Sequence, residues 1–218
     1  LQADGVYATQ AEADKANLVN SSMQAYQAGD VRFIDQNNDG RIDIKDRISL
    51  GSAAPDYFGG FYTNFRYRHF ALSAEFAYSK GNKAYNAVRR TLESASSFSN
   101  QSVAVSNRWS VEGQVTDMPR ATFGDAIGNN NFSSRWIEDA SYLRIKNITL
   151  SYNFDKPIWN FFRSGTIYVT GENLLTATKY LGLDPEFAYS SSDNATQGFD
   201  YAKVMQPKSV KLGINLKF

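Results

Sequence analysis

Five segments of the chain alternate apolar and polar residues with a period of two. The clearest is residues 209–218, in which every second residue is apolar: Val210, Leu212, Ile214, Leu216 and Phe218. Ser, Lys, Gly and Asn fill the positions between them. Because successive side chains of a β-strand point to opposite faces, this pattern predicts a strand with one apolar and one polar face.

Four earlier segments show the same period, and we predict a strand in each: Tyr57–Tyr67, His69–Ser79, Tyr142–Phe154 and Ser164–Asn173. The second of them is nearly as regular as the last strand, with an apolar residue at every second position from Phe70 to Tyr78. Period-two alternation with many aromatic residues is typical of strands that bury or cover only one face. The pattern therefore predicts an all-β fold.

The connections between these strands alternate between short and long. The short ones are Arg68 alone and Asp155–Arg163, and the long ones are Leu1–Asp56, Lys80–Ser141 and Leu174–Pro207. Outer-membrane barrels have short periplasmic turns and long extracellular loops. Loops of this length are uncommon in compact soluble domains. The alternation therefore favours a transmembrane β-barrel in a bacterial outer membrane, and it places the long connections outside the cell.

We accordingly expect about five C-terminal strands of a large antiparallel transmembrane β-barrel. Five strands cannot close a barrel, and lipid does not tolerate open strand edges, so further strands are expected upstream of Leu1. Residues 1–56 are predicted to form an extracellular loop, and residues 57–218 the strands and their loops. The alternative that alternation leaves open is a soluble β-sandwich with inward apolar faces.

Three local features add to this scheme. Within Tyr142–Phe154 the apolar positions change phase at Lys146–Asn147, which predicts either a β-bulge or an upper portion that projects beyond the membrane. In the connection after Lys80, residues 84–94 form a short candidate helix. The aromatic residues Trp159, Phe161 and Phe162 cluster in the predicted short turn, as they do at a membrane interface.

Composition excludes several functions. The formal net charge of +1 shows no footprint for nucleic-acid binding. The chain has no Cys and a single His, His69, so a thiol nucleophile or a His-based catalytic triad has no residues to use. The chain contains no run of about 18 apolar residues, which a transmembrane helix would need. We therefore expect a protein that is not an enzyme.

The sharpest local motif is residues 35–46, which match an EF-hand-like calcium loop at positions 1, 3, 5, 7, 9 and 12. The predicted ligands are Asp35, Asn37, Asp39, Arg41, Asp43 and Asp46, with Arg41 acting through its backbone carbonyl. Gly40 allows the sharp turn at position 6. The ion would make the loop rigid and would have no catalytic role. The alternative is an Asx-rich turn without metal.

Aromatic residues in the long loops are candidates for ligand binding, because aromatic faces stack on sugars. The candidates are Tyr85, Trp109, Trp136 and Tyr180, together with Phe132 and Tyr189. The alternative for each of them is that its ring packs the long loops together.

Ten short motifs follow one another along the chain: Gly29–Arg32, Asp46–Gly51, Tyr57–Phe61, Asn107–Trp109, Pro119–Arg120, Ser133–Asp139, Ser141–Leu150, Gly171–Leu174, Lys179–Glu186 and Gly213–Phe218. In this order and spacing they resemble the C-terminal region of the SusC/RagA family of TonB-linked outer-membrane proteins of Bacteroidetes. The resemblance covers the chain from about Gly29 to Phe218. The plug and the TonB box of that family would lie in sequence that this chain does not contain.

The resemblance implies a 22-stranded barrel with an N-terminal plug, energised by TonB and capped by a SusD-like lipoprotein. It implies import of glycans or peptides, with outer-membrane lipid and the rest of the barrel as further partners. Two rivals remain: a passive porin or adhesin barrel, and a soluble calcium-binding β-module of a carbohydrate-active protein. The sequence does not name the substrate.

Overall fold

The computed structural model describes residues 1–154, 163–187 and 196–217. Contacts along the chain separate two compact units. The first unit comprises Leu1–Gly51, Ala84–Glu138 and Ala188–Ala202, and the second comprises Ser52–Lys83, Asp139–Phe187 and Lys203–Phe218. The first unit thus gathers most of the predicted loops, and the second contains all of the predicted strands.

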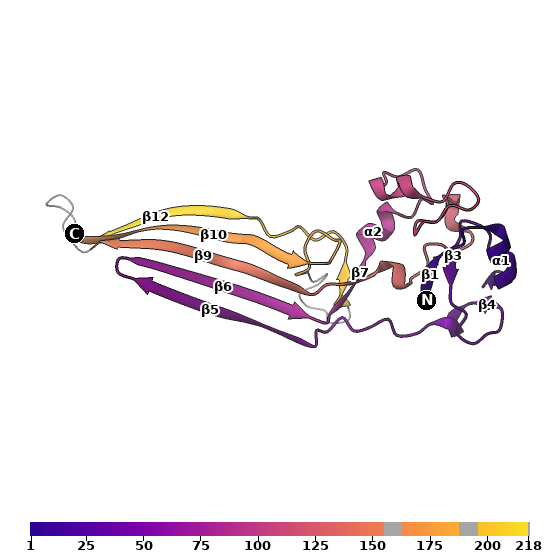
Figure 1. Ribbon diagram of the computed structural model, residues 1–218, viewed down its shortest axis with the longest axis horizontal. Coiled ribbons are helices and arrows are strands. Elements are labelled where there is room, and N and C mark those ends of the chain that lie inside the picture. The colour runs from indigo at the N-terminus through magenta and orange to yellow at the C-terminus, as the bar shows by residue number, and fades with distance from the viewer. Residues whose placement is uncertain (155–162, 188–195, 218) are drawn as a thin grey trace. The chain divides into compact units, whose positions relative to one another are not determined.

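The second unit is built on a five-stranded antiparallel sheet, which Figure 1 shows with its strands side by side. Its strands are β5 (Tyr57–Tyr67), β6 (Phe70–Lys80), β9 (Tyr142–Phe154), β10 (Ser164–Thr178) and β12 (Ser209–Lys217). They lie in the order β12-β10-β9-β6-β5, so each strand pairs with the next one of the five along the chain. The predicted meander of five strands is confirmed.

Three predicted strand boundaries were wrong: both ends of β6, which runs from Phe70 to Lys80, and the end of β10. The turn between β5 and β6 contains His69 as well as Arg68, because Tyr67 pairs with Phe70 and reversal of the chain takes two residues. Strand β10 continues past Asn173 to Thr178, since residues 175–178 pair with residues 142–145 of β9. The predicted end of the last strand, Phe218, and the aromatic residues 159, 161 and 162 lie outside the described residues.

One face of the sheet carries rows of large apolar side chains that cross all five strands. Direct cross-strand partners form one row: Phe65, Leu72, Leu150, Val169 and Leu212. A second row consists of Tyr67, Phe70, Tyr152, Ile167 and Ile214. All ten side chains are exposed. This is the face that the alternating pattern assigns to lipid.

The opposite face carries polar rows between the apolar ones. One of them consists of Asn64, Ser73, Thr149, Thr170 and Lys211. The hydroxyl oxygens of Thr149 and Thr170 lie 2.8 Å apart, and either group can donate the hydrogen bond. The separation of polar and apolar rows is what a barrel wall between water and lipid requires.

The predicted bulge in β9 is confirmed, and it keeps the two faces separate. Asn147 pairs with Glu75 and Ile145 pairs with Phe76, so Lys146 has no direct partner in β6. Because of this extra residue, Ile145 lies on the apolar face with Phe76. Its position number is odd, whereas the apolar residues earlier in the pairing, Ile148 and Leu150, have even numbers. The change of phase in the sequence is therefore the signature of the bulge.

The first unit is built from short elements. They are β1 (Ala3–Val6), α1 (Gln10–Ala16), β2 (Val19–Asn20), β3 (Val31–Phe33), β4 (Arg41–Ile42), β7 (Lys83–Asn86), α2 (Ala87–Leu92), β8 (Ile137–Asp139), β11 (Phe199–Asp200) and the 3₁₀ helices η1 (Ile44–Asp46), η2 (Val103–Asn107), η3 (Phe123–Asp125) and η4 (Ser134–Trp136). Strand β1 pairs antiparallel with β3, β2 pairs parallel with β4, and the third sheet has the order β11-β7-β8. A buried cluster that includes Tyr7, Tyr26, Val31 and Phe33 forms the core beneath the first two sheets.

The predicted helix at residues 84–94 is shorter than expected. Residues up to Asn86 belong to β7, in which the Tyr85 N–H donates a 2.7 Å hydrogen bond to the Gly198 carbonyl. The helix then begins because the Asn86 side chain caps it by accepting a 2.9 Å hydrogen bond from the Arg89 N–H. No helix in the described part of the chain is long and apolar enough to cross a membrane.

The assignment of the two faces can be tested at neighbouring residues of β6. If the apolar face contacts lipid, Phe76→Lys should destabilise the folded protein in phospholipid vesicles by ~2–4 kcal/mol. Glu75→Lys changes the next residue, which lies on the polar face, and should cost less than ~1 kcal/mol. The measurement is urea unfolding followed by tryptophan fluorescence, and equal costs for the two variants would contradict the assignment.

Candidate functional site

The residues of the predicted calcium loop form a closed loop in the first unit. Two backbone N–H groups, those of Asn38 and Gly40, each donate a 2.8 Å hydrogen bond to the Asp35 carboxylate. At the other end, the fully buried Asp46 carboxylate accepts hydrogen bonds from the N–H groups of Gln36 (2.9 Å) and Asp43 (2.7 Å). Backbone donors therefore hold both ends of the loop.

The middle of this loop is organised around Asp39. Its carboxylate accepts hydrogen bonds from the Asn37 amide (2.9 Å) and the Arg41 N–H (3.0 Å), and Lys45 Nζ lies 3.6 Å away. The Asn37 hydrogen bond is the main reason that the pKa of Asp39 is lowered. Among the described residues, no three His, Cys, Asp or Glu side chains are grouped so that they could hold a metal ion. Calcium binding stays a prediction.

Of the six aromatic residues predicted to bind ligand, Phe132 stacks on Tyr85 with ring centroids 4.7 Å apart, and four pack against neighbouring parts of the chain. Tyr85, Trp136 and Tyr180 are buried. Trp109 covers Gly29, where an added Cβ would lie 2.5 Å from the ring, and its Nε1–H donates a 3.0 Å hydrogen bond to the Ala8 carbonyl. In this structure the rings support the loops, and ligand binding by them stays a prediction. The further candidate at residue 189 lies outside the described residues.

Trp136 is surrounded by charge. The guanidinium carbons of Arg135 and Arg89 lie 4.6 and 5.5 Å from its ring centroid. Arg89 in turn pairs with Glu93 at 3.0 Å and with Glu138 at 2.8 Å. Burial, and then the nearby Arg89, lower the pKa of Arg135 to about 10. Stacking of cations on this ring gives the motif at residues 133–139 a structural role.

A buried carboxylate joins two further motifs in the first unit. Asp30 is fully buried, and both of its oxygens bind Arg120, at 2.8 and 3.1 Å. The Asn129 amide donates to the same carboxylate at 3.1 Å, while its oxygen accepts the Val31 N–H at 2.8 Å. A two-point contact between guanidinium and carboxylate fixes orientation as well as distance. The contact therefore determines how the segments at residues 29–32 and 119–120 pack.

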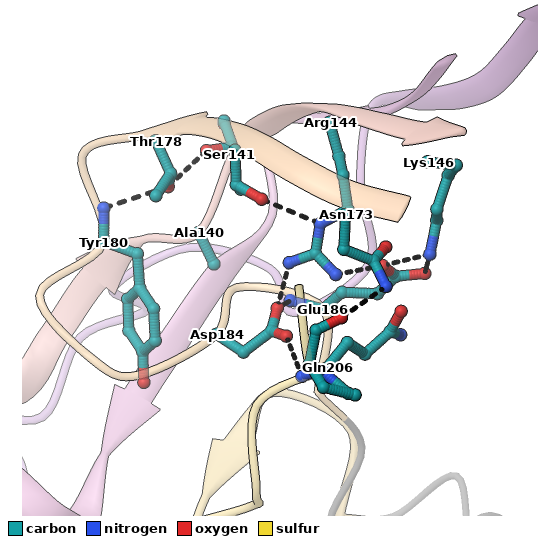
Figure 2. A network of polar contacts seen from close by, with 12 residues as sticks. Ala140, Ser141, Arg144, Lys146, Asn173, Thr178, Tyr180, Asp184, Glu186 and Gln206 are labelled. Atoms are coloured by element: carbon teal, nitrogen blue, oxygen red, sulfur yellow. Dashed lines mark hydrogen bonds and ion pairs between the residues drawn. The ribbon is translucent and has the colours of Figure 1, made fainter. Parts of the chain in front are cut away.

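A second charged network lies in the second unit, on the polar face at the upper part of β9 (Figure 2). Arg144 is 3% exposed, and its Nε–H donates a 2.9 Å hydrogen bond to Thr176 in β10. Its two terminal nitrogens bind the carboxylates of Asp184 and Glu186, the latter at 2.9 Å. Lys146 binds both oxygens of Glu186, at 2.8 and 2.6 Å.

The network ties the segment after β10 back to the sheet. Asp184 also accepts backbone hydrogen bonds from Glu186 at 2.9 Å and Gln206 at 3.2 Å. Burial alone would raise the pKa of Asp184, but the Arg144 guanidinium and these N–H groups outweigh it, so the pKa is lowered. The carboxylate therefore stays charged at neutral pH and holds residues 184–186 against the inner, polar face.

The sequence interpretation did not identify these interactions, although it singled out both segments. The signal was present as opposite charges in two motifs, with Arg144 and Lys146 in one and Asp184 and Glu186 in the other. Charge alone does not say which acid meets which base, because many pairings are equally good before the strands are in register. The pairing of β9 with β10 selects this one.

Comparison with known proteins gives the relatives of the chain. The TonB-dependent receptor P26 of Formosa agariphila is 31% identical over 219 residues, which cover 98% of this chain and 22% of the receptor. The TonB-dependent receptor SusC of Bacteroides thetaiotaomicron is 28% identical over 193 residues, which cover 85% of this chain and 17% of that receptor. The chain thus spans about a fifth of the length of these relatives. No family model matches it.

Solved structures agree on the fold. The structure of the RagAB peptide transporter matches with a TM-score of 0.74 at 22% identity, covering all of this chain and 22% of the matched chain. The RagAB peptide importer in its closed-closed state matches with a TM-score of 0.68 at 24% identity and the same coverage. The predicted fold class, part of a large antiparallel β-barrel, is confirmed. The comparisons identify the chain as a SusC/RagA-like part of a TonB-dependent receptor.

Proposed function

We propose that the protein containing this chain imports nutrients across the bacterial outer membrane, driven by TonB and working with a SusD-like lipoprotein. The observation that carries the proposal is the match of 98% of the chain to a TonB-dependent receptor. The structure adds a sheet of five paired strands with an exposed apolar face. The chemistry is binding and gated passage, with no covalent step.

The dimensions and side chains of the sheet support its place in the membrane. An 11-residue strand such as β5 or β6 is about 36 Å long at ~3.3 Å per residue, or about 28 Å high when tilted by ~40°. The apolar band of such barrels is about 25 Å tall. Aromatic rings flank the band on the outer face, with Tyr67 and Tyr152 near the short turns and Tyr57 and Tyr78 near the long connections.

The loops provide the substrate-handling end. The Arg144 network holds residues 184–186 on the inner side of the wall, where a substrate would pass. The first unit adds a packed platform of loops around Asp30 and Trp136. We propose that these loops help to enclose a chamber beneath the lipoprotein. The substrate is a glycan or a peptide, and the relatives named RagAB are described as peptide importers.

The function is tested by uptake in cells that carry this protein. Import of a fluorescent oligosaccharide or oligopeptide library should stop when TonB is inactivated, because the energy for release of bound substrate comes from the inner membrane. Uptake that continues unchanged without TonB would indicate a passive barrel instead. The encoded SusD-like partner should also co-purify with the protein from outer membranes, and its absence would contradict the proposed pair.

The role of the charged network is tested by Arg144→Met. This change leaves two carboxylates near the inner face without their buried partner, a loss of about 3–5 kcal/mol in comparable pairs. Chymotrypsin should then cut residues 180–187 at least about tenfold faster, because freed loop residues open more often. Lys211→Met is the matched control, since it removes an exposed ion pair with Glu172 that is worth at most about 1 kcal/mol.

The same network predicts a dependence on pH. The pKa of Asp184 in the folded protein lies below its ordinary value of 3.8, so the contribution of its charge is complete above that pH. The stabilisation by the Asp184 charge is lost as the pH falls through the pKa that Asp184 has in the folded protein.

Equal cleavage rates in the Arg144→Met variant and the unchanged protein at neutral pH would contradict the role of the network.

We also propose that the loop at residues 35–46 binds one calcium ion, on the strength of its ligand spacing. The ion would displace Lys45 from Asp39 and take oxygens from Asp35 and Asn37. Isothermal calorimetry should detect one site, and Asp35→Ala combined with Asp39→Ala should abolish it. Asp14→Ala, which removes an exposed acid of α1, is the control. Unchanged binding by the double variant would reject the loop as the site.

A further inference from the structure

A hollow of about 520 Å³ lies in the second unit where β5, β6, β9 and β10 meet the long connections. We call it the rim pocket. The residues that matter for its chemistry are Tyr57, Tyr78, Lys80, Leu143 and Lys179. None of them belongs to the calcium loop or to the network around Arg144.

The register of the strands places the pocket mainly on the outer, apolar face. Tyr78 pairs with Leu143, and Tyr57 pairs with Lys80, and each of these pairs continues the outer rows described above. The rings of Tyr57 and Tyr78 meet edge to face, with centroids 6.3 Å apart. The pocket therefore opens at the point where the lipid-facing wall ends and the polar headgroup region begins.

The charge of the pocket is positive. Lys80 and Lys179 are exposed, and in the part of the chain that the structure describes neither is joined to a carboxylate by an ion pair. The lining contains one acid, Asp139, whose Oδ1 accepts hydrogen bonds from the Ser141 N–H (3.0 Å) and hydroxyl (2.5 Å). These hydrogen bonds, and the nearby Lys83 and Lys80, lower its pKa. Two ammonium groups thus remain for an anion from outside.

We propose that the rim pocket binds the headgroup of a phosphorylated glycolipid of the outer leaflet. Lys80 and Lys179 would bind a phosphate, and the tyrosine rings would stack on the sugar that carries it. The acyl chains would lie along the outer rows that begin at Leu143. The proposal rests on the proposed function only in requiring that this end of the sheet faces outward in the outer membrane.

Three features together point to this ligand. An acyl chain alone would need no cations, and a free phosphate would need no apolar wall. A phospholipid would satisfy the cations and the wall, but it would leave the rings of Tyr57 and Tyr78 without a sugar to stack on. A phosphorylated sugar with attached acyl chains uses the cations, the rings and the apolar rows at once.

The test compares bound lipid in purified protein. The intact protein is extracted from outer membranes in mild detergent, and phosphorylated glycolipid per protein is measured by mass spectrometry. Lys80→Gln combined with Lys179→Gln should reduce it about 25-fold, because each lysine near an anionic surface contributes about a factor of five. Lys15→Gln combined with Lys208→Gln, which removes two exposed lysines outside the pocket, should leave it unchanged.

A second measurement separates the ligand chemistries and guards against misfolding. In vesicles of phosphatidylethanolamine, added monophosphoryl lipid A should raise the unfolding midpoint of the unchanged protein and not that of the Lys80/Lys179 variant. Lipid A without its phosphate should have no effect. Equal glycolipid content in the Lys80/Lys179 variant and the unchanged protein would overturn the proposal. Selective loss of phospholipid from that variant would also overturn it. Nutrient uptake is measured separately, so failure of import and failure of lipid binding are distinguishable.

Discussion

The separation of polar and apolar rows across the five paired strands is the constraint on which the rest of the structure depends. Every backbone pair of the sheet fixes which side chains share a face, and a slip of one residue would exchange lipid-facing and water-facing groups. In β9 the alternation of apolar and polar residues changes phase at Lys146, and the bulge there compensates for that change. It keeps Ile145 on the apolar face and leaves Arg144 on the polar one, where its carboxylate partners lie.

This arrangement connects the wall to the loops. Buried ion pairs are costly to break because the remaining partner is left uncompensated, so they hold a segment in one place even where they add little net stability. The two networks, around Asp30 in the first unit and around Arg144 in the second, use this property within separate parts of the chain. Each joins motifs that are distant in sequence, and this explains why those motifs carry residues of opposite charge.

Much of the sheet could be predicted because its driving pattern is local. Period-two alternation located β5 and β9 to the residue and identified the bulge from a change of parity. Other features depended on distant partners. Strand β10 passes Asn173, a residue with φ of 51°, only because β9 continues to pair with it. The burial of Tyr85 and Trp136 inside the loops likewise follows from tertiary packing, which the spacing of aromatic residues does not reveal.

The most direct test of the account is the environment of each position along β6 and β9. The chain has no cysteine, so single cysteines can carry spin labels one at a time. Accessibility to oxygen should be high at Leu72, Phe76, Ile145 and Ile148, and accessibility to a water-soluble nickel complex should be high at Ser73 and Glu75. The alternation should change phase once, at Lys146. Alternation without that change, or with oxygen favoured on both faces, would contradict the account.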